Sequence, residues 1–273
     1  MSKNALSYLG YIALLCCVCL LVYQNTAVQK THPQNRAETV ITQIATIDSL
    51  LAGVYDGETT LEKLLEYGDF GIGTFEKLDG EMIVLNGNVY QIKADGNVYR
   101  PSLQTTTPFA SVVPFSKMNV KATEIQSTLD YESIQRTINE TVANDNVPIA
   151  IRMTGRFSQV KTRSVPPQKK PYPPLVEVTK NQPEFDLGTL EGTVVGFRLP
   201  KYFQGINVPG YHLHFLSQDE KRGGHVLNLT MESGRIEYSP IHQFQMLLPE
   251  KISDFSNVDL TQDRSKELKS VEQ

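Results

Sequence analysis

Cysteine is nearly absent from this chain of 273 residues, and its three copies, Cys16, Cys17 and Cys19, all lie near the start. The remainder of the sequence therefore has no residue that could form a disulfide bond, and it offers no thiolate to a metal ion. Any metal site in that remainder must be built from histidine and carboxylate side chains.

A sustained run of lysine or arginine is also missing, and the formal net charge is −4 at pH 7. Binding to nucleic acid depends strongly on basic residues, so the composition gives no support to that function. The one locally basic stretch, which contains Lys161, Arg163, Lys169 and Lys170, is typical of a solvated loop. With 40% hydrophobic and 21% charged residues, the chain has the composition of a globular protein, and no internal repeat is visible.

The first residues carry a different signal. Lys3 precedes an uncharged stretch over residues 5–23, which is typical of a secretory hydrophobic region, although no clear small-residue cleavage site follows it. A run of this length could also remain as a membrane anchor. We expect residues 1–30 to be a signal peptide or an N-terminal membrane anchor with its spacer. The protein would then be secreted or periplasmic, or attached to the membrane through residues 5–23 if the segment is not cleaved.

Apolar periodicity and turn dipeptides predict the elements of the first half. Apolar residues at helical spacing predict a helix over residues 37–51, and Thr59 with Glu62 forms a capping box for a second helix that ends near Leu65. Short strand-like runs follow, separated by Asp-Gly and Asn-Gly dipeptides that are typical of an antiparallel meander. These runs cover residues 71–77, 82–85, 89–92 and 98–100.

The second half is predicted to be mostly strand. A helix over residues 130–142 and a strand over residues 149–157 lead into a proline-rich crossing loop. Four further strands are then expected to form a second sheet, over residues 193–199, 211–216, 226–231 and 243–248. The charged tail from residue 250 shows no clear pattern. The prediction is an α+β fold with two β-rich units of mixed or antiparallel sheet flanked by a few helices, with an N-terminal α+β domain over 37–175 and a C-terminal metal-binding domain over 176–273.

Three of the five histidines fall within fourteen residues. Side chains alternate along a strand, so His212 and His214 point to one face, while Leu213 and Phe215 point to the packed face. The polar, glycine-terminated stretch that follows predicts a hairpin, which would bring His225 opposite or diagonal to His214. Three imidazoles would then converge on one point, near enough to bind a metal ion at about 2.0–2.1 Å.

Three protein ligands with an open fourth position are typical of a catalytic zinc site, although imidazole also suits copper, iron and nickel. Zinc is the preferred prediction. The plainer interpretation of a lone His-x-His pair is that it belongs to a half-exposed strand, and the third histidine is what favours a metal. His32 lies in the polar spacer and His242 is interpreted as a surface residue, so neither is counted as a ligand.

Several short motifs, in their order and separation, make the chain similar to α-acetolactate decarboxylase over nearly everything beyond the spacer. They are Gly-Asp-Phe-Gly-Ile-Gly-Thr-Phe at 68–75, Leu-Asp-Gly-Glu-Met-Ile at 78–83, Val-Lys-Thr-Arg-Ser-Val-Pro at 160–166, Pro-Gly-Tyr-His-Leu-His-Phe at 209–215 and Gly-Gly-His-Val-Leu at 223–227. The resemblance implies a zinc ion on His212, His214 and His225. It also implies that Glu81, Arg163 and Glu272 line the site, with Thr74 close by; Glu267 is the alternative to Glu272 in the divergent tail.

The reaction implied by this resemblance is the conversion of 2-acetolactate to (R)-acetoin and carbon dioxide, in a protein that is expected to be a homodimer. Loss of the carboxylate pushes an electron pair toward the neighbouring ketone and generates an enediolate. Zinc chelated by the hydroxyl and ketone oxygens would stabilise that charge, so no organic cofactor is needed. Arg163 is suited to orient the substrate. A glutamic acid, Glu81 or Glu272, would deliver the proton that fixes the handedness of the product.

Two other classes of protein share the histidine pattern. A cupin-like oxygenase also places His-x-His on a strand, but its third histidine would lie in a distant second motif, whereas His225 follows closely. A secreted metal-binding module could use zinc only to stabilise the hairpin. That second alternative would leave the open coordination position and Arg163 without a role.

Overall fold

The computed structural model describes residues 40–272, and these residues belong to a single compact unit. The expected signal peptide or anchor and its spacer lie outside the described residues. Among the helices of the described part, none has the length and apolar character needed to cross a membrane.

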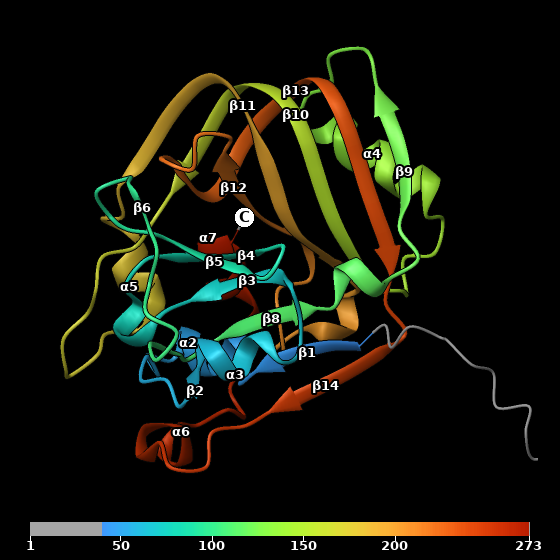
Figure 1. Ribbon diagram of the computed structural model, residues 1–273. Coiled ribbons are helices and arrows are strands. Elements are labelled where there is room, and N and C mark those ends of the chain that lie inside the picture. Colours follow the sequence, from blue (N-terminus) through green and yellow to red (C-terminus); the bar gives the residue numbers. More distant parts are fainter. Residues whose placement is uncertain (1–39, 273) are drawn as a thin grey trace, which may run out of the picture. The chain divides into compact units, whose positions relative to one another are not determined.

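A seven-stranded sheet forms the base of the molecule in Figure 1, in the order β14-β1-β8-β3-β4-β5-β6. All its neighbouring strands are antiparallel except β1 and β14, which run parallel. The two-residue turn between β4 and β5 is Asn86-Gly87, and both residues have positive φ, as this tight hairpin requires. The strands are β1 (Val40–Ile44), β3 (Phe70–Thr74), β4 (Glu81–Leu85), β5 (Asn88–Ile92), β6 (Val98–Tyr99), β8 (Ala110–Val113) and β14 (Gln243–Leu247).

The second sheet arches over the first (Figure 1) and has the order β10-β11-β12-β13-β9. Because β10 also pairs with β13, four of its strands form a closed circuit, with β9 attached outside it. The strands are β9 (Lys121–Ile125), β10 (Ile149–Arg163), β11 (Glu184–Leu199), β12 (Gly210–Ser217) and β13 (Gly223–Pro240).

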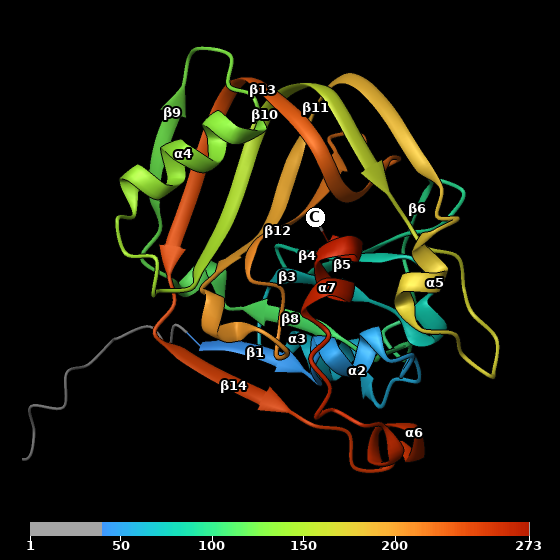
Figure 2. The same ribbon diagram turned by 180° about the vertical axis from the view of Figure 1, so that it is seen from behind.

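Short elements complete the described residues. β2 (Thr59–Thr60) pairs with β7 (Thr106–Thr107) as a separate ribbon. The α-helices are α2 (Ile47–Leu51), α3 (Leu61–Leu65), α4 (Tyr131–Thr141), α5 (Leu175–Thr179), α6 (Ser253–Asn257) and α7 (Ser265–Glu272), and the 3-10 turns are Glu76–Leu78, Phe115–Lys117 and Lys201–Phe203. Figures 1 and 2 both place α7 between the two sheets.

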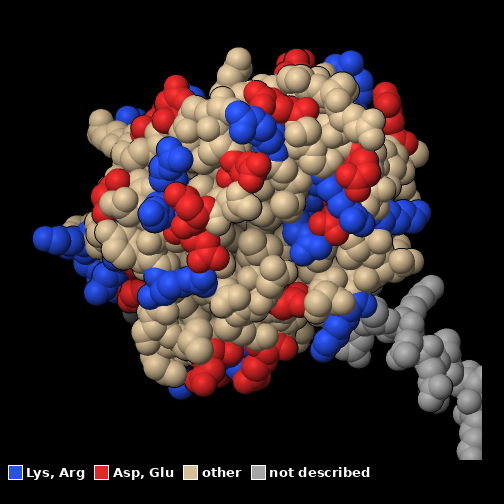
Figure 3. All heavy atoms as spheres, turned by 45° about the horizontal axis from the view of Figure 1, so that its top comes forward, with Lys and Arg blue, Asp and Glu red and all other residues tan. Residues whose placement is uncertain are grey.

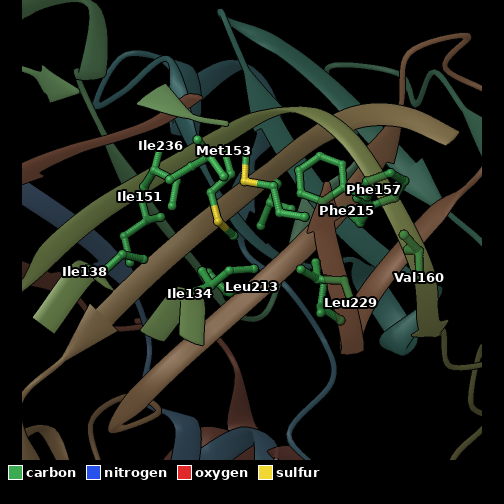
Figure 4. Packing of buried hydrophobic residues seen from close by; sticks show 14 of the residues in the cluster. Ile134, Ile138, Ile151, Met153, Phe157, Val160, Leu213, Phe215, Leu229 and Ile236 are labelled. Atoms are coloured by element: carbon green, nitrogen blue, oxygen red, sulfur yellow. The ribbon is translucent and has the colours of Figure 1, made fainter. Parts of the chain in front are cut away.

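One face of the arched sheet packs around α4. Asp130 caps this helix by accepting a hydrogen bond from the Ser133 backbone, and the helical spacing of Ile134 and Ile138 turns both side chains to the sheet. Figure 4 shows them against Leu213, Phe215 and neighbouring apolar side chains of β10 and β13. The packed face of β12 is therefore the one that the alternation of Leu213 and Phe215 predicts.

The opposite face of the arched sheet meets the seven-stranded sheet in a second apolar cluster, which includes Val195 and Phe197 from β11 and Ile72, Ile83 and Ile92 from the base. Strand alternation puts His212 and His214 on this inner side. The contact between the two sheets thus determines where the imidazoles lie.

A row of three glycines crosses the arched sheet at the middle of its long strands, where Figure 1 shows them bend. Gly155 of β10 pairs with Gly192 of β11 on one side and with Gly234 of β13 on the other. A Cβ on Gly155 would lie 2.1 Å from the Ser233 carbonyl oxygen, so only glycine fits there.

The face seen in Figure 3 carries acidic and basic side chains interspersed, with no patch of a single sign among its described residues. On the arched sheet, side chains of opposite charge pair between neighbouring strands, as in Arg156 with Glu232 and Arg235 with Glu124.

Two predictions about the fold were wrong in detail. Residues 37–51 are not one helix: the described part consists of strand β1 followed by the short helix α2, because the backbone of β1 pairs with β14 on one side and, from Thr42 to Ile44, with β8 on the other. The strand predicted over residues 243–248 corresponds to β14, and it joins the base sheet rather than the second one. The tail, which shows no clear pattern in the sequence, contains the two helices α6 and α7. β10 pairs with β11 across residue 175, where the sequence favours a domain boundary.

Candidate metal centre

The three clustered histidines come together at the hairpin of β12 and β13. His214 is directly opposite His225 in the register of these strands, and His212 lies two residues before His214 on the same face. One ring nitrogen of each lies within 4.8 Å of the other two. The predicted pairing of His214 with His225 is therefore confirmed.

All three imidazoles are buried, with 7% of His212, 1% of His214 and 3% of His225 exposed. Burial, with a smaller contribution from the Arg163 charge, lowers the pKa of His212 to about 3. Burial likewise holds the pKa values of His214 and His225 well below the usual range. The rings are therefore neutral at physiological pH, which is the state that binds a metal ion.

The base sheet fixes the orientation of one ring. Nδ1 of His214 lies 2.9 Å from the backbone carbonyl oxygen of Met82 in β4, so it carries the proton and donates. Its Nε2 then has a free lone pair on the other side of the ring. This atom and Nδ1 of His225 are buried without a hydrogen-bond partner.

Two glutamates approach the same point from different elements. Oε2 of Glu81, at the start of β4, lies 3.5 Å from Nε2 of His214. Oε2 of Glu272, on α7, lies 3.4 Å from Nε2 of His212 and 3.8 Å from Nδ1 of His225. Figure 2 shows how α7 reaches the interior beside the strands of the base sheet.

Arg163 lies between the two carboxylates at the end of β10. Its Nη1 is 3.4 Å from Oε1 of Glu81, and its Nη2 is 3.6 Å from Oε1 of Glu272. Nη2 also donates to the Val271 carbonyl oxygen at 2.9 Å. Each carboxylate thus turns one oxygen to the guanidinium and the other to the imidazoles.

Burial raises the pKa of Glu81 to about 7, with Arg163 opposing the rise and the neighbouring Glu272 adding to it. Burial also raises the pKa of Glu272, and Arg163 again acts in the opposite direction. If both buried carboxyl groups were ionised, they would carry two negative charges beside the single positive charge of the guanidinium. A cation would stabilise their ionised forms.

A cavity opens beside this group. Its polar wall is formed by Thr74, Glu81, Arg163, His212 and Glu272, while its apolar wall comes from Ile47, Leu50, Leu78, Phe109, Val165 and Leu175. The Thr74 hydroxyl donates to the Gly80 carbonyl oxygen at 2.7 Å, which anchors the turn just before Glu81. The backbone of Leu78 in the same turn has a φ of 60°, an uncommon conformation for a leucine.

The structure therefore brings together every residue that the sequence singled out for the site: His212, His214, His225, Glu81, Arg163, Glu272 and Thr74. Of the two candidates in the tail, Glu272 lines the cavity, whereas Glu267 lies beside Arg264, whose Nη1 is 3.6 Å from its Oε2. His242 is exposed, in keeping with its interpretation as a surface residue. Sequence reasoning missed the Met82 carbonyl and the apolar wall, since both depend on contacts between distant segments.

These residues fit a divalent metal ion on two independent grounds. Two imidazole nitrogens and Oε2 of Glu272 are buried with no hydrogen-bond partner, although buried polar atoms are normally satisfied. These atoms also face one another, and the two carboxylates beside them have only one guanidinium to balance their charge. Imidazole and carboxylate are donors that zinc accepts, and a set with no thiolate is compatible with other divalent ions as well.

The fold and the site define an α+β protein whose two sheets enclose a buried set of imidazoles, carboxylates and one guanidinium, as is typical of metal-dependent enzymes. The sequence model of α-acetolactate decarboxylase matches residues 41–262. The chain belongs to the α-acetolactate decarboxylase family, whose members are carboxy-lyases. This assignment removes the cupin-like alternative.

Individual relatives agree with the family assignment. The chain is 43% identical over 241 residues to the α-acetolactate decarboxylase of Methylococcus capsulatus, covering 88% of this chain and 92% of that protein. It is also 43% identical over 238 residues to the enzyme of Methanosarcina mazei, covering 87% of this chain and 82% of the relative. The crystal structure of α-acetolactate decarboxylase from Bacillus subtilis strain 168 superposes with a TM-score of 0.82 at 38% identity, covering 85% of this chain and 99% of that one.

Proposed function

We propose that this protein decarboxylates 2-acetolactate to (R)-acetoin and carbon dioxide, with a zinc ion held by His212, His214 and His225. The observation that carries the proposal is the grouping of three neutral imidazoles with two carboxylates and Arg163, beside a cavity that His212, Glu81, Arg163 and Glu272 line, in a chain of this family. Bound zinc would supply Lewis-acid polarisation of the substrate ketone.

The protein's own groups account for binding and orientation. Arg163 presents a planar fork toward the cavity, which suits one carboxylate or two neighbouring oxygens of the substrate. A strong grip on the departing carboxylate would stabilise the ground state and slow the reaction, so we assign Arg163 an orienting role. The apolar wall, which includes Leu50, Leu78 and Leu175, accommodates the two methyl groups and excludes water.

The chemistry breaks one carbon–carbon bond. As carbon dioxide leaves, the electron pair of that bond forms a carbon–carbon double bond to the ketone carbon, and the π electrons of the ketone move to its oxygen. The resulting enediolate takes one proton on carbon to give acetoin. A carboxylic acid fixed on one side of the substrate delivers that proton to one face, which determines the handedness of the product. Glu81 and Glu272 are the two candidates, because both carboxyl groups line the cavity.

The test uses protein purified without residues 1–30 and racemic 2-acetolactate. We expect formation of (R)-acetoin, its loss on treatment with a strong chelator and its recovery on addition of zinc. Glu81→Gln should keep the metal and lose turnover, because Glu81 approaches only one imidazole. If well-folded, zinc-loaded protein forms no acetoin, the proposed function is wrong. Loss of the metal ion from Glu81→Gln would overturn the division of roles between the histidines and Glu81.

Two further proposals concern the whole protein. We infer from residues 5–23 that the protein is exported or anchored in a membrane, and from the family resemblance that it is a homodimer. Fractionation of cells with N-terminal sequencing of the product tests the first proposal, and light scattering of the purified protein tests the second.

A further inference from the structure

Ser164 follows the last residue of β10 and is completely buried. Its hydroxyl donates to the backbone carbonyl oxygen of Ile92 in β5 at 2.7 Å. β10 belongs to the arched sheet and β5 to the base sheet. This hydrogen bond therefore joins the two sheets directly beside Arg163.

The acceptor is placed next to a second site residue. Ile92 is paired with Glu81 in the register of β4 and β5. The Ser164 hydroxyl thus ties the end of the Arg163 strand to the backbone opposite Glu81. The side chains of Arg163 and Glu81 belong to different sheets, yet Nη1 and Oε1 approach to 3.4 Å. Their separation depends on how the two sheets are held at this point.

A second polar contact crosses between the sheets close to Glu81 in the sequence. Nδ1 of His214 donates to the carbonyl oxygen of Met82, the residue after Glu81. The His214 contact orients an imidazole of the candidate metal site. Ser164 is not itself a candidate ligand, so its hydrogen bond can act on the site only through its chain neighbour Arg163.

We propose that Ser164 is a positioning residue that fixes the Arg163 guanidinium relative to Glu81 through its hydrogen bond to the Ile92 carbonyl. This inference deepens the proposed function and rests on it for its kinetic part. Ser164 does not line the cavity, so it acts through Arg163 and makes no contact with the substrate. A displacement of about 1 Å in a site can lower the rate by roughly a hundredfold, so loss of one such bond is measurable.

A matched control exists in the same sheet. Ser239 in β13 is 1% exposed, and its hydroxyl donates to the backbone carbonyl oxygen of Asn119 at 3.1 Å. It is absent from the cavity lining. Ser239→Ala therefore removes the same kind of hydrogen bond without altering the support of Arg163.

The kinetic experiment is a double-mutant cycle on the zinc-loaded protein. We expect Ser164→Ala to lower kcat/KM about tenfold with metal content unchanged, and Ser239→Ala to change it less than twofold. In an Arg163→Lys background, which retains charge but lacks the fork, Ser164→Ala should cost less than about threefold. Ser164→Cys conserves the volume and a weak donor, and should fall between wild type and Ser164→Ala.

A structural measurement decides the inference independently of turnover. Crystal structures should show the distance from Nη1 of Arg163 to Oε1 of Glu81 lengthened in Ser164→Ala and unchanged in Ser239→Ala. An unchanged distance in Ser164→Ala, or equal losses of kcat/KM in the wild-type and Arg163→Lys backgrounds, would overturn the positioning role. Should wild-type protein form no acetoin, the proposed function fails, and the crystallographic comparison still decides the role of Ser164.

Discussion

At the scale of single residues, the site depends on side chains whose polar atoms are buried before any ligand binds. His214 uses one ring nitrogen to donate to Met82 and leaves the other without a partner. Leaving a buried polar atom unpaired costs roughly 1–3 kcal/mol. The fold sustains this cost because the same strands bury a large apolar cluster on their other face.

His214→Ala is expected to abolish metal binding and acetoin formation, because it removes the imidazole that the base sheet orients. The exposed residue His242 supplies the control: His242→Ala should keep both metal and activity. Metal analysis of the dialysed variants measures the first effect, and the acetoin assay measures the second. Stoichiometric metal in His214→Ala would show that the three-histidine site is not the one that binds it.

Several residues of the site were predictable because their signals are local. The alternation of His212, Leu213 and His214 is a property of any extended strand, and the glycines before His225 predict the hairpin return. The Ser164 hydroxyl and the Met82 carbonyl were not predictable, since each meets a partner in the other sheet. Glu272 came only from the family resemblance, because α7 is short, half of its eight residues are charged, and its only buried apolar residues are Leu268 and Val271.

At the scale of elements, the arched sheet can bend because glycines from three strands lie side by side. Gly155→Val is expected to destabilise the protein by about 3 kcal/mol or more, since a side chain there would collide with the backbone of β13. Gly188→Ala is the control, because Gly188 has a positive φ but open space around it, and it should cost about 1 kcal/mol. Urea unfolding measures both; equal losses would mean that crowding at Gly155 is relieved by a shift of the strands.

A salt bridge between β10 and β13 gives stability that depends on pH. Arg152 donates two hydrogen bonds to Glu237, at 2.7 and 2.9 Å, and this interaction lowers the pKa of Glu237. Because the folded pKa lies below the unfolded one, the contribution is present at neutral pH and is lost as the pH falls through the folded pKa.

Glu237→Gln should therefore lower the free energy of unfolding by about 1 kcal/mol at pH 7 and have no effect once wild-type Glu237 is protonated. Glu232→Gln breaks the more exposed pair with Arg156 in the same strands and should cost less than about 0.5 kcal/mol. Urea unfolding at pH 7, 5 and 3 tests both. A difference for Glu237→Gln that stays constant down to pH 3 would contradict the electrostatic origin.

Strand prediction succeeded where turn dipeptides bound the strands, as Asn86-Gly87 does for β4 and β5. It failed for β1, whose Val40, Ile41 and Ile44 are also spaced as on a helix. Burial of Thr42 and Gln43 between two strand neighbours decided the outcome. Gln43 is satisfied there by distant partners, among them the Asn207 side chain, which no local pattern contains.

At the scale of the whole molecule, neither sheet is made from one half of the chain. A fragment of residues 40–175 would lack β14 and the partners of β10, and a fragment of residues 176–273 would lack β10. We expect each fragment alone to lack a cooperative unfolding transition by circular dichroism, because each exposes long unpaired strand edges. A two-state transition in either fragment would support the domain boundary that the sequence favours near residue 175.

The parallel pairing of β1 with β14 joins Val40 to Gln243, about two hundred positions later. A ribosome adds roughly 5–20 residues per second, so about 10–40 seconds pass between the synthesis of β1 and that of β14. During this time one edge of β1 has no strand to pair with. During translation this strand is open to pairing with other nascent chains. Protection by a chaperone would therefore matter most for this edge, and a slower ribosome should lower the yield of soluble protein.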